Sequence, residues 1–352
     1  MSVAEKTEVL ELSSLIAGEA MGGALLDVIY PYPGEVAGRV WQVDGGGLER
    51  ALTATQPVAL TRWQRHEILS NARALLSERA EEFAQLIRSE TGLCMRETRC
   101  EVGRTQDVLQ FAAMEALRDD GQIFSCDISP QGQARKIFTM REPLKLVAAI
   151  TPFNHPLNQV AHKLSPAIAA GAPVILKPSE KTPLTALRFT ELLYEAGLPP
   201  SMLSTIVGSV DEVVTPLIAD DRVELVSFTG SVAIGKTISR TAGYKKLCLE
   251  LGGNSPLIVL DDADLELAVT LTDEGCFRNS GQRCTAVKRL LIHEAVLDEF
   301  TEAFVAKLTE YPCGDPAHDA TRVGTVIDEP AAKLLESRVE KAVASGARVL
   351  AG

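Results

Sequence analysis

Residues 144–177 read LKLVAAITPFNHPLNQVAHKLSPAIAAGAPVILK, and this stretch decides the fold class. Two short apolar runs, 146–150 and 174–176, flank a longer helical stretch, and such runs are typical of buried strands. Further apolar runs lie at 204–207, 224–228 and 246–251, and helical stretches separate them at 182–196 and 232–242. The alternation predicts a doubly wound parallel sheet, in which ligands bind beyond the carboxyl ends of the strands.

The same alternation restarts after Asn254, which predicts a second α/β unit beginning around Gly253. Its predicted strands are 256–260 and 289–293, and its predicted helices are 265–278, 297–311 and 329–345. The last residues, 347–352, have the apolar character of a strand that enters a sheet.

Upstream of residue 144, the pattern predicts two long helices and a hairpin. Apolar residues such as Leu69, Leu76 and Ile87 recur at helical spacing, so residues 62–91 are expected to form one helix that ends at Gly92. A second helix is expected at 95–117. Residues 122–142 combine glycine and proline with alternating side chains, which is typical of a hairpin, here an arm that leaves the domain.

Composition excludes several classes of protein. The 352 residues are 46% hydrophobic and 23% charged, enough for a sizeable core, which excludes fibrous and disordered chains. The net charge of −12 repels nucleic acid and anionic membranes. Residues 1–26 lack a basic segment followed by an apolar one, and no apolar run is long enough to span a bilayer. We expect a soluble, unexported protein with neither nucleic acid nor membrane as partner.

The seven cysteines are odd in number and form neither a CxxC pair nor a paired histidine spacing. This pattern disfavours a disulfide framework and a structural zinc site, so no metal is predicted. Free thiols fit a reducing cytoplasm.

One motif favours a different class of enzyme. GSVAIGKT at 230–237 matches the phosphate-loop pattern GxxxxGK[ST], and LIVLDD at 257–262 resembles the acidic strand that helps to hold Mg²⁺. A glycine-rich turn at a helix N-terminus indicates a phosphate, whichever molecule carries it. The motif follows several βα units and is not near the start of the sheet. An NTPase that depends on Lys236 is therefore an alternative.

Five segments together suggest a family. They are TPFNHP at 151–156, LKPSE at 176–180, FTGS at 228–231, LELGG at 249–253 and GQRC at 281–284. In this order and spacing they resemble the aldehyde dehydrogenase superfamily, from about Arg62 to the end of the chain. The resemblance implies a Rossmann-like NAD-binding domain of residues 1–121 and 144–252, an oligomerisation hairpin at 122–143 and a catalytic domain at 253–352.

The resemblance assigns three catalytic roles. Cys284 is the expected nucleophile, because a thiolate attacks an aldehyde carbon to give a thiohemiacetal. Asn154 is expected to donate its side-chain N–H to the oxyanion, together with the Cys284 backbone N–H. Glu250, at the end of an apolar strand, is expected to activate the water that hydrolyses the thioester.

The cofactor expected from the resemblance is NAD. Lys177 and Glu180 would bind the adenosine ribose, and a carboxylate there repels a 2′-phosphate, so NAD is preferred over NADP. Gly230 and Ser231 would contact the pyrophosphate. The complete expected set is Thr151, Phe153, Lys177, Glu180, Phe228, Gly230, Ser231 and Leu251.

Basic residues near the nucleophile suggest an anionic aldehyde. Arg283 precedes Cys284, His155 follows Asn154, and Arg104 could face the tunnel through which the substrate would reach Cys284. Guanidinium groups donate paired hydrogen bonds that fit a carboxylate, phosphate or phosphonate. For Arg104 the alternative is a solvated helix face that pairs with Glu101. Residues 151–163 and 193–199 look most like the phosphonoacetaldehyde dehydrogenase branch. Lactaldehyde, succinate semialdehyde and glyceraldehyde 3-phosphate remain alternative substrates.

Family members continue well beyond the equivalent of residue 352, so the chain is expected to be C-terminally truncated. The complete protein is expected to be a homodimer or homotetramer. Without the missing strand, the hairpin would present an exposed edge. An inactive NAD-binding fragment is a further alternative.

Overall fold

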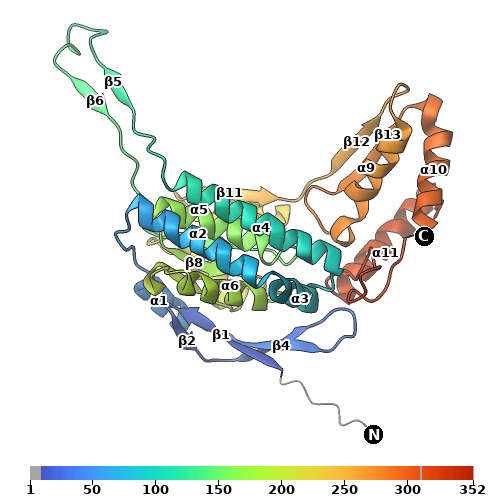
Figure 1. Cartoon of the computed structure of the whole chain (residues 1–352), viewed down its shortest axis with the longest axis horizontal. Helices are drawn as coiled ribbons and strands as arrows, with labels where there is room; N and C mark the ends of the chain where they lie inside the picture. The colour runs from blue at the N-terminus through green and yellow to red at the C-terminus, as the bar shows by residue number, and fades with distance from the viewer. Residues whose placement is uncertain (1–8, 310, 352) are drawn as a thin grey trace.

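The computed structural model describes residues 9–309 and 311–351. Residues 1–8, Glu310 and Gly352 belong to segments interpreted above and lie outside the described residues. The described chain is an α/β protein with a nine-stranded sheet, a two-stranded parallel sheet and a two-stranded hairpin (Figure 1). No helix within 9–309 or 311–351 is both long and apolar enough to cross a membrane.

The large sheet has the strand order β11-β10-β7-β8-β9-β1-β4-β3, and β2 pairs with β1. Its five parallel strands are the predicted ones: β7 (Val147–Ile150), β8 (Val174–Lys177), β9 (Leu203–Thr205), β10 (Leu225–Gly230) and β11 (Lys246–Leu251). The chain runs outward from β7 through β8 and β9 and returns on the other side of β7 as β10. The strand order therefore reverses between β7 and β10, which is where such folds bind ligands.

Four short strands that the sequence did not predict extend this sheet. They are β1 (Leu10–Ile16), β2 (Glu19–Met21), β3 (Leu25–Ile29) and β4 (Val36–Trp41). Strand β1 joins β9 in antiparallel orientation, through Leu15 opposite Thr205, and runs parallel to β4.

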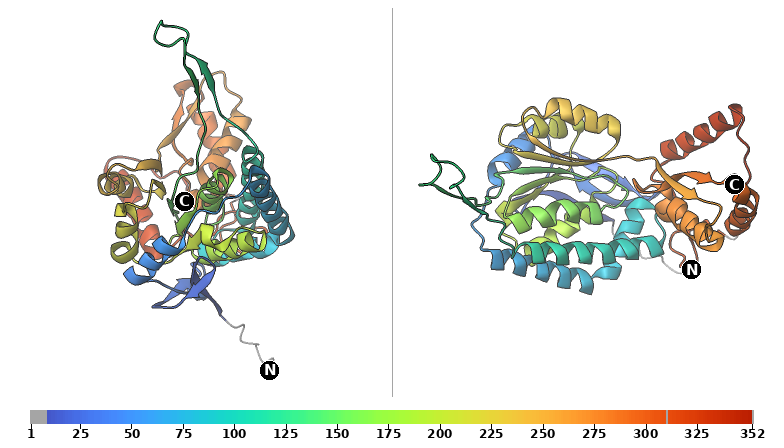
Figure 2. Two further views of the ribbon diagram at one scale, coloured as in Figure 1. Left: turned by 90° about the vertical axis from the view of Figure 1, so that its left-hand side faces the viewer. Right: turned by 90° about the horizontal axis from the view of Figure 1, so that it is seen from above.

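Helices cover both faces of the large sheet (Figure 2). One face carries α2 (Arg62–Glu78), α3 (Ala80–Thr91), α4 (Met95–Glu115), α5 (Asn158–Ala170) and α6 (Leu184–Glu195). The other carries α1 (Gly45–Ala54), α7 (Thr215–Ala219) and α8 (Val232–Thr241). Because side chains alternate along a strand, Val147 and Ala149 of β7 enter the first core while Ala148 and Ile150 enter the second.

The prediction of one helix over 62–91 is wrong. Arg79 (φ −106°, ψ 21°) leaves the helical conformation, so α2 ends and α3 begins there. The break redirects the chain: α2 packs against α4, α5 and α6, whereas α3 also reaches β3. Phe83 and Ile87 remain buried, so the apolar pattern continues across the break and conceals it.

The second α/β unit contains the remaining large elements. They are β12 (Ser255–Val259), α9 (Leu265–Phe277), β13 (Val287–Ile292), α10 (Leu297–Thr309) and α11 (Glu329–Ala344). This unit also contains the short 3-10 helices η3 (Arg278–Gly281) and η4 (Glu294–Val296), whereas the 3-10 helix η1 (Pro200–Met202) and the π-helix η2 (Val210–Val214) belong to the first part of the chain. The predicted strand at 347–352 is wrong for its described residues. Val349 and Leu350 are exposed and pair with no strand of the described chain, and a strand needs a hydrogen-bonded neighbour.

The predicted hairpin is present. Strands β5 (Ile123–Ser125) and β6 (Lys136–Phe138) pair antiparallel, with Ile123 opposite Phe138. The hairpin extends away from the rest of the chain as an arm (Figure 1).

Candidate active site

Cys284 lies in the turn that joins η3 to β13, and its thiol is exposed. The backbone just before it is strained, because Asn279 (φ 60°) and Ser280 (φ 52°) adopt the left-handed conformation together with Gly281 (φ 70°). For most residues other than glycine this conformation costs about 1–2 kcal/mol, and asparagine tolerates it better than serine does. Strain of this kind persists only where the surroundings fix it, and it concentrates at functional sites.

Two asparagines fasten this turn to the loop after β7. Asn279, only 2% exposed, donates its Nδ2 to the Asn154 carbonyl oxygen at 2.9 Å. Asn154 in turn donates its Nδ2 to the Gln282 carbonyl oxygen at 2.7 Å. The predicted oxyanion donor therefore lies beside the nucleophile's loop. Sequence reasoning missed Asn279, although its position in the segment before Cys284 was a signal.

Glu250 approaches the same turn from β11. It is the penultimate residue of that strand, lies opposite Thr229 and is exposed at the edge of the sheet. A Cβ added at Gly253 would lie 3.0 Å from the Cys284 carbonyl oxygen, so the end of β11 touches the Cys284 turn. The structure thus brings Cys284, Asn154 and Glu250 to one edge of the sheet.

A buried lysine that sequence reasoning missed lies near Glu250. Lys163 of α5 donates its Nζ to Thr229 Oγ1 at 2.8 Å and to Ser227 Oγ at 3.1 Å. Burial lowers the pKa of Lys163 to about 8, and the nearby Cys248 and Glu250 oppose the shift. A lysine on a mostly apolar helix was the available signal.

The predicted ribose-binding residues follow β7 and β8. The Thr151 N–H donates to the Lys177 carbonyl oxygen at 3.2 Å, which joins the two strand ends. Lys177 is 4% exposed and pairs with Glu180; burial lowers the lysine pKa, and Glu180 opposes that shift. Phe153 lies near Lys181, whose Nζ is 6.0 Å from the ring centroid. Thr151 Oγ1 is buried without a partner, as expected of a group that meets a ligand.

The predicted pyrophosphate-binding residues lie where β10 leads into α8. Gly230 packs on the Phe228 ring, which leaves no room for a side chain. Ser231 caps the N-terminus of α8, and Leu251 packs against the same helix at Gly235. A helix N-terminus beside a glycine, at the point where the strand order reverses, fits the diphosphate of a dinucleotide.

The NTPase interpretation does not fit this geometry. Helix α8 starts at Val232, directly after Ser231, so no loop remains to enclose phosphates. Lys236 is exposed inside the helix, and Thr237 donates its hydroxyl to the Ala233 carbonyl oxygen. The acidic residues at 261–262 follow β12, which belongs to the other sheet.

The three predicted substrate-binding residues line one small cavity. It encloses about 10 Å³ and is lined by Glu97, Cys100, Glu101, Arg104, His155, Asn158, Arg278 and Arg283. That space holds about one water molecule, so an anionic group would have to displace the arginine side chains outward. Glu101 makes no hydrogen bond to Arg104 and instead accepts from the backbone at the start of α5.

His155 does not supply positive charge, contrary to the expectation. Burial, together with Arg104, Arg283 and Arg278, lowers its pKa to about 4, so the imidazole is neutral near pH 7. Arg283 donates to the Glu274 and Gly275 carbonyl oxygens at 2.8 and 3.1 Å. The cavity therefore relies on guanidinium groups for charge.

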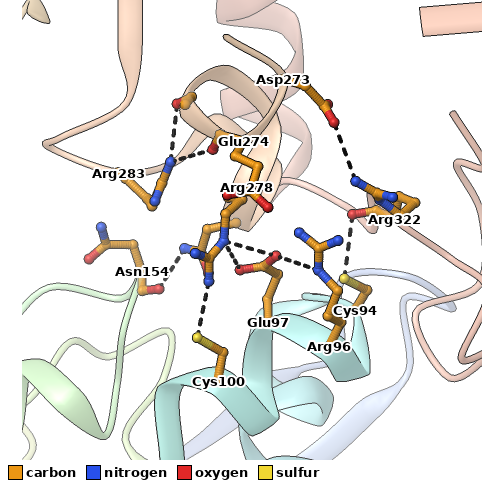
Figure 3. Close-up of polar contacts among 12 residues, drawn as sticks. Cys94, Arg96, Glu97, Cys100, Asn154, Asp273, Glu274, Arg278, Arg283 and Arg322 are labelled. Carbon is orange, nitrogen blue, oxygen red and sulfur yellow. Dashed lines mark hydrogen bonds and ion pairs between the residues drawn. The ribbon is translucent and has the colours of Figure 1, made fainter. Parts of the chain in front are cut away.

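Arg278 is the cavity's third arginine, and sequence reasoning missed it. Figure 3 shows its side chain between Glu97 and Cys100 of α4, with Nε 3.1 Å from Glu97 Oε2 and Nη2 3.0 Å from Cys100 Sγ. Glu97 also pairs with Arg96, at 3.3 Å. Arg278 lies six positions before Cys284, close enough for the motif to have suggested it.

No group of three His, Cys, Asp or Glu side chains in the described part of the chain is arranged to hold a metal ion. All seven cysteines are free thiols.

Comparison with known proteins identifies the family. The model of the aldehyde dehydrogenase family matches residues 19–352. The chain belongs to this family. It is 41% identical over 290 residues to 3-sulfolactaldehyde dehydrogenase of Priestia megaterium, covering 82% of this chain and 61% of that protein. It is 39% identical over 332 residues to aspartate-semialdehyde dehydrogenase 1 of Pseudomonas canavaninivorans, covering 93% and 70%.

Solved structures agree with this assignment. The crystal structure of aldehyde dehydrogenase 21 from Physcomitrella patens, in complex with the reaction product succinate, has a TM-score of 0.95 and 35% sequence identity. The match covers 98% of this chain and 74% of that one. The chain spans about two thirds of the length of the curated relatives it matches.

Proposed function

We propose that this aldehyde dehydrogenase chain oxidises a short anionic aldehyde to its carboxylate. The observation that carries the proposal is the cavity beside the Cys284 turn, where Arg104, Arg278 and Arg283 line one space with a neutral His155. A paired guanidinium environment stabilises a carboxylate, phosphonate or sulfonate group.

In this proposal, each catalytic side chain acts where its contacts place it. The Cys284 thiolate attacks the carbonyl carbon and forms a thiohemiacetal, while Asn154 Nδ2 turns from the Gln282 carbonyl to the developing oxyanion. A nicotinamide cofactor, which Thr151, Lys177 and Glu180 would hold, would supply the hydride acceptor needed to take this adduct to the thioester. Glu250, exposed at the end of β11, then takes a proton from the water that releases the acid.

We propose NAD as the cofactor, with NADP the less favoured partner. Thr151, Lys177 and Glu180 surround the ends of β7 and β8, and the Glu180 carboxylate would accept from a free ribose 2′-hydroxyl. The same carboxylate would repel a 2′-phosphate. The nearby Lys177 ammonium, already paired with Glu180, does not offset that repulsion.

Among anionic aldehydes we favour phosphonoacetaldehyde. Relatives named for 3-sulfolactaldehyde and aspartate semialdehyde, and a structural neighbour that holds succinate, support a small anionic substrate. Succinate semialdehyde and glyceraldehyde 3-phosphate use the same guanidinium chemistry and remain alternatives. Lactaldehyde, which is uncharged, would gain little from the arginines.

We further propose that the hairpin arm binds a second copy of the chain, in a homodimer or homotetramer. Its apolar side chains are exposed, among them Ile123 at 84% and Phe138 at 69%. Exposed apolar groups on an unpaired strand edge favour association. We also propose a cytoplasmic location, because all seven cysteines are free thiols.

Substitution of the arginines tests this function. Arg104→Ala and Arg283→Ala should each lower kcat/KM for phosphonoacetaldehyde about tenfold or more, the loss expected when one charge-assisted contact is removed. The same variants should leave kcat/KM for propionaldehyde nearly unchanged. Equal effects on both aldehydes, or none, would exclude an anion-selective site.

A further inference from the structure

A buried glutamate that the proposed chemistry does not use borders the anion cavity. Glu101 of α4 is 3% exposed, and its Oε1 accepts from the backbone N–H groups of Leu157 at 2.8 Å and Asn158 at 2.9 Å. Its other oxygen, Oε2, is buried and has no hydrogen-bond partner. A buried carboxylate oxygen without a partner is costly and calls for an explanation.

Glu101 both holds the start of α5 and lines the anion cavity. Oε1 holds the first turn of α5, which directly follows the loop of Asn154 and His155. The residue also lines the cavity together with Arg104 and Arg283. Oε1 therefore holds the helix that follows the loop of the oxyanion donor, and the residue itself lines the cavity that an anionic substrate group would enter.

The charge of this wall depends on Glu101. Three arginines and two glutamates line the cavity, and Glu97 is already paired with Arg278. Ionised Glu101 leaves a net charge of about +1, and protonated Glu101 leaves about +2. Because Glu101 is buried, water screens its charge little, so the protonation of this carboxyl changes how well the site accepts an anion.

We propose that Glu101 is a specificity-determining residue of this site, which weakens the binding of anionic groups when ionised and admits them when protonated. The inference rests on the proposed anionic substrate. Protonated Oε2 also becomes a donor that can hydrogen-bond to an oxygen of a phosphonate or carboxylate.

Burial supports a titration near neutral pH. It raises the pKa of Glu101 to about 7, while the two backbone N–H groups and Arg104 oppose the shift. His155 is neutral above its pKa of about 4, so it does not change charge between pH 6 and 8. The charged and titratable groups around Glu101 are Glu97, Cys100 and Arg104 on its own helix, His155 before α5, Arg278 and Arg283 after α9, and Glu90 on α3.

The chain contains a matched control. Glu90 of α3 is fully buried and accepts from the N–H groups of Leu184 at 2.8 Å and Thr185 at 3.1 Å, at the start of α6. Burial raises its pKa to about 8. Glu90 thus repeats the Glu101 arrangement, but it does not line the anion cavity.

The test compares alkylation of Cys284 by iodoacetate, which is anionic, and by iodoacetamide, which is neutral. Thiolate displaces iodide from both, so the ratio of the two rates cancels the ionisation of Cys284 itself. Peptide mass spectrometry measures the ratio at Cys284 and at the exposed Cys313 in one sample. We expect the Cys284 ratio in the parent chain to exceed that at Cys313, and to fall about fivefold from pH 6 to pH 8.

Glu101→Gln keeps an acceptor for both N–H groups and removes the titration. Its Cys284 ratio should stay high and flat across that pH range. Glu90→Gln should keep the fall with pH seen in the parent, with at most a small shift of its midpoint, because the two carboxyls interact. A parent ratio that does not change from pH 6 to pH 8, or a Glu101→Gln ratio equal to the parent's at both, overturns the role of Glu101. A parent Cys284 ratio no higher than that of Cys313 instead refutes the anion-selective site itself.

Discussion

Two neighbouring residues before Cys284 should respond in opposite directions when each is replaced by glycine. Asn279 and Ser280 are both left-handed, but their side chains differ in what they contribute. The Asn279 amide binds the Asn154 carbonyl oxygen, whereas Ser280 Oγ is buried without a partner.

The magnitudes follow from these contacts. Asparagine tolerates the left-handed conformation, so Asn279→Gly relieves little strain, and it leaves the Asn154 carbonyl unpaired at a cost of about 1–3 kcal/mol. Asn279→Ala loses the same contact and places an alanine, which tolerates this conformation less well than glycine, at position 279, so it should cost about 1 kcal/mol more than Asn279→Gly. Ser280→Gly relieves about 1–2 kcal/mol of strain and removes an unpaired hydroxyl. Glycine also makes the unfolded chain more flexible, which lowers the free energy of unfolding by about 0.5–1 kcal/mol. The net effect of Ser280→Gly should be a free energy of unfolding about 1 kcal/mol higher than that of the parent.

Urea unfolding of the three variants measures these free energies, provided that the slope with denaturant stays constant. Iodoacetamide alkylation of Cys284 provides a second reading, because a loosened turn should change the rate in both Asn279 variants. Equal stability of Asn279→Ala and Asn279→Gly, or destabilisation by Ser280→Gly, would refute the reasoning that strain and one amide contact fix this turn.

Three further predictions concern stability, cofactor choice and assembly. Burial raises the pKa of Glu90 to about 8, above the unfolded value of about 4.3. The stabilisation that protonated Glu90 contributes to the free energy of unfolding is therefore complete below about pH 4 and is lost as pH rises through 8. Glu90→Gln should therefore flatten the decline in unfolding free energy between pH 5 and 8, measured by urea titration. Glu180→Ser should raise NADP affinity relative to NAD about tenfold by calorimetric titration, and an unchanged ratio would exclude its role at the ribose. Combined Phe124→Ser and Phe138→Ser should lower the mass measured by light scattering to that of one chain; an unaltered mass would locate the interface elsewhere.

Local patterns predicted the centre of the fold well. The central strands β7, β8, β9 and β10 lie close to their predicted positions, because buried strands need continuous apolar side chains. The run at 246–251 coincides with β11, although that strand lies at the edge of the sheet and is not buried as predicted. The break at Arg79 was hidden because Phe83 continues the apolar spacing of Leu76. The N-terminal strands were missed because β1 and β4 are short, mix buried with half-buried residues and depend on pairing with each other.

The candidate site was predicted in part for a similar reason. Cys284, Asn154 and Glu250 stand in short motifs, and their meeting was expected from the family resemblance that those motifs carry; strand order alone could not bring Cys284 there, because it lies outside the large sheet. Arg278 and Glu101 acquire their roles from partners far away in sequence, Glu97 and the start of α5, and local patterns hold no trace of such contacts. The neutrality of His155 likewise results from burial beside arginines.

We propose above all that the chain oxidises an anionic aldehyde through an adduct on Cys284, with NAD as the oxidant. The most direct test of this claim is NADH formation at 340 nm by the purified chain with phosphonoacetaldehyde and with propionaldehyde, with the folded, NAD-binding Cys284→Ala variant as control. We predict turnover that requires Cys284 and a higher kcat/KM for phosphonoacetaldehyde. NADH formation equal in the parent and in Cys284→Ala, or a preference for propionaldehyde, would contradict the claim.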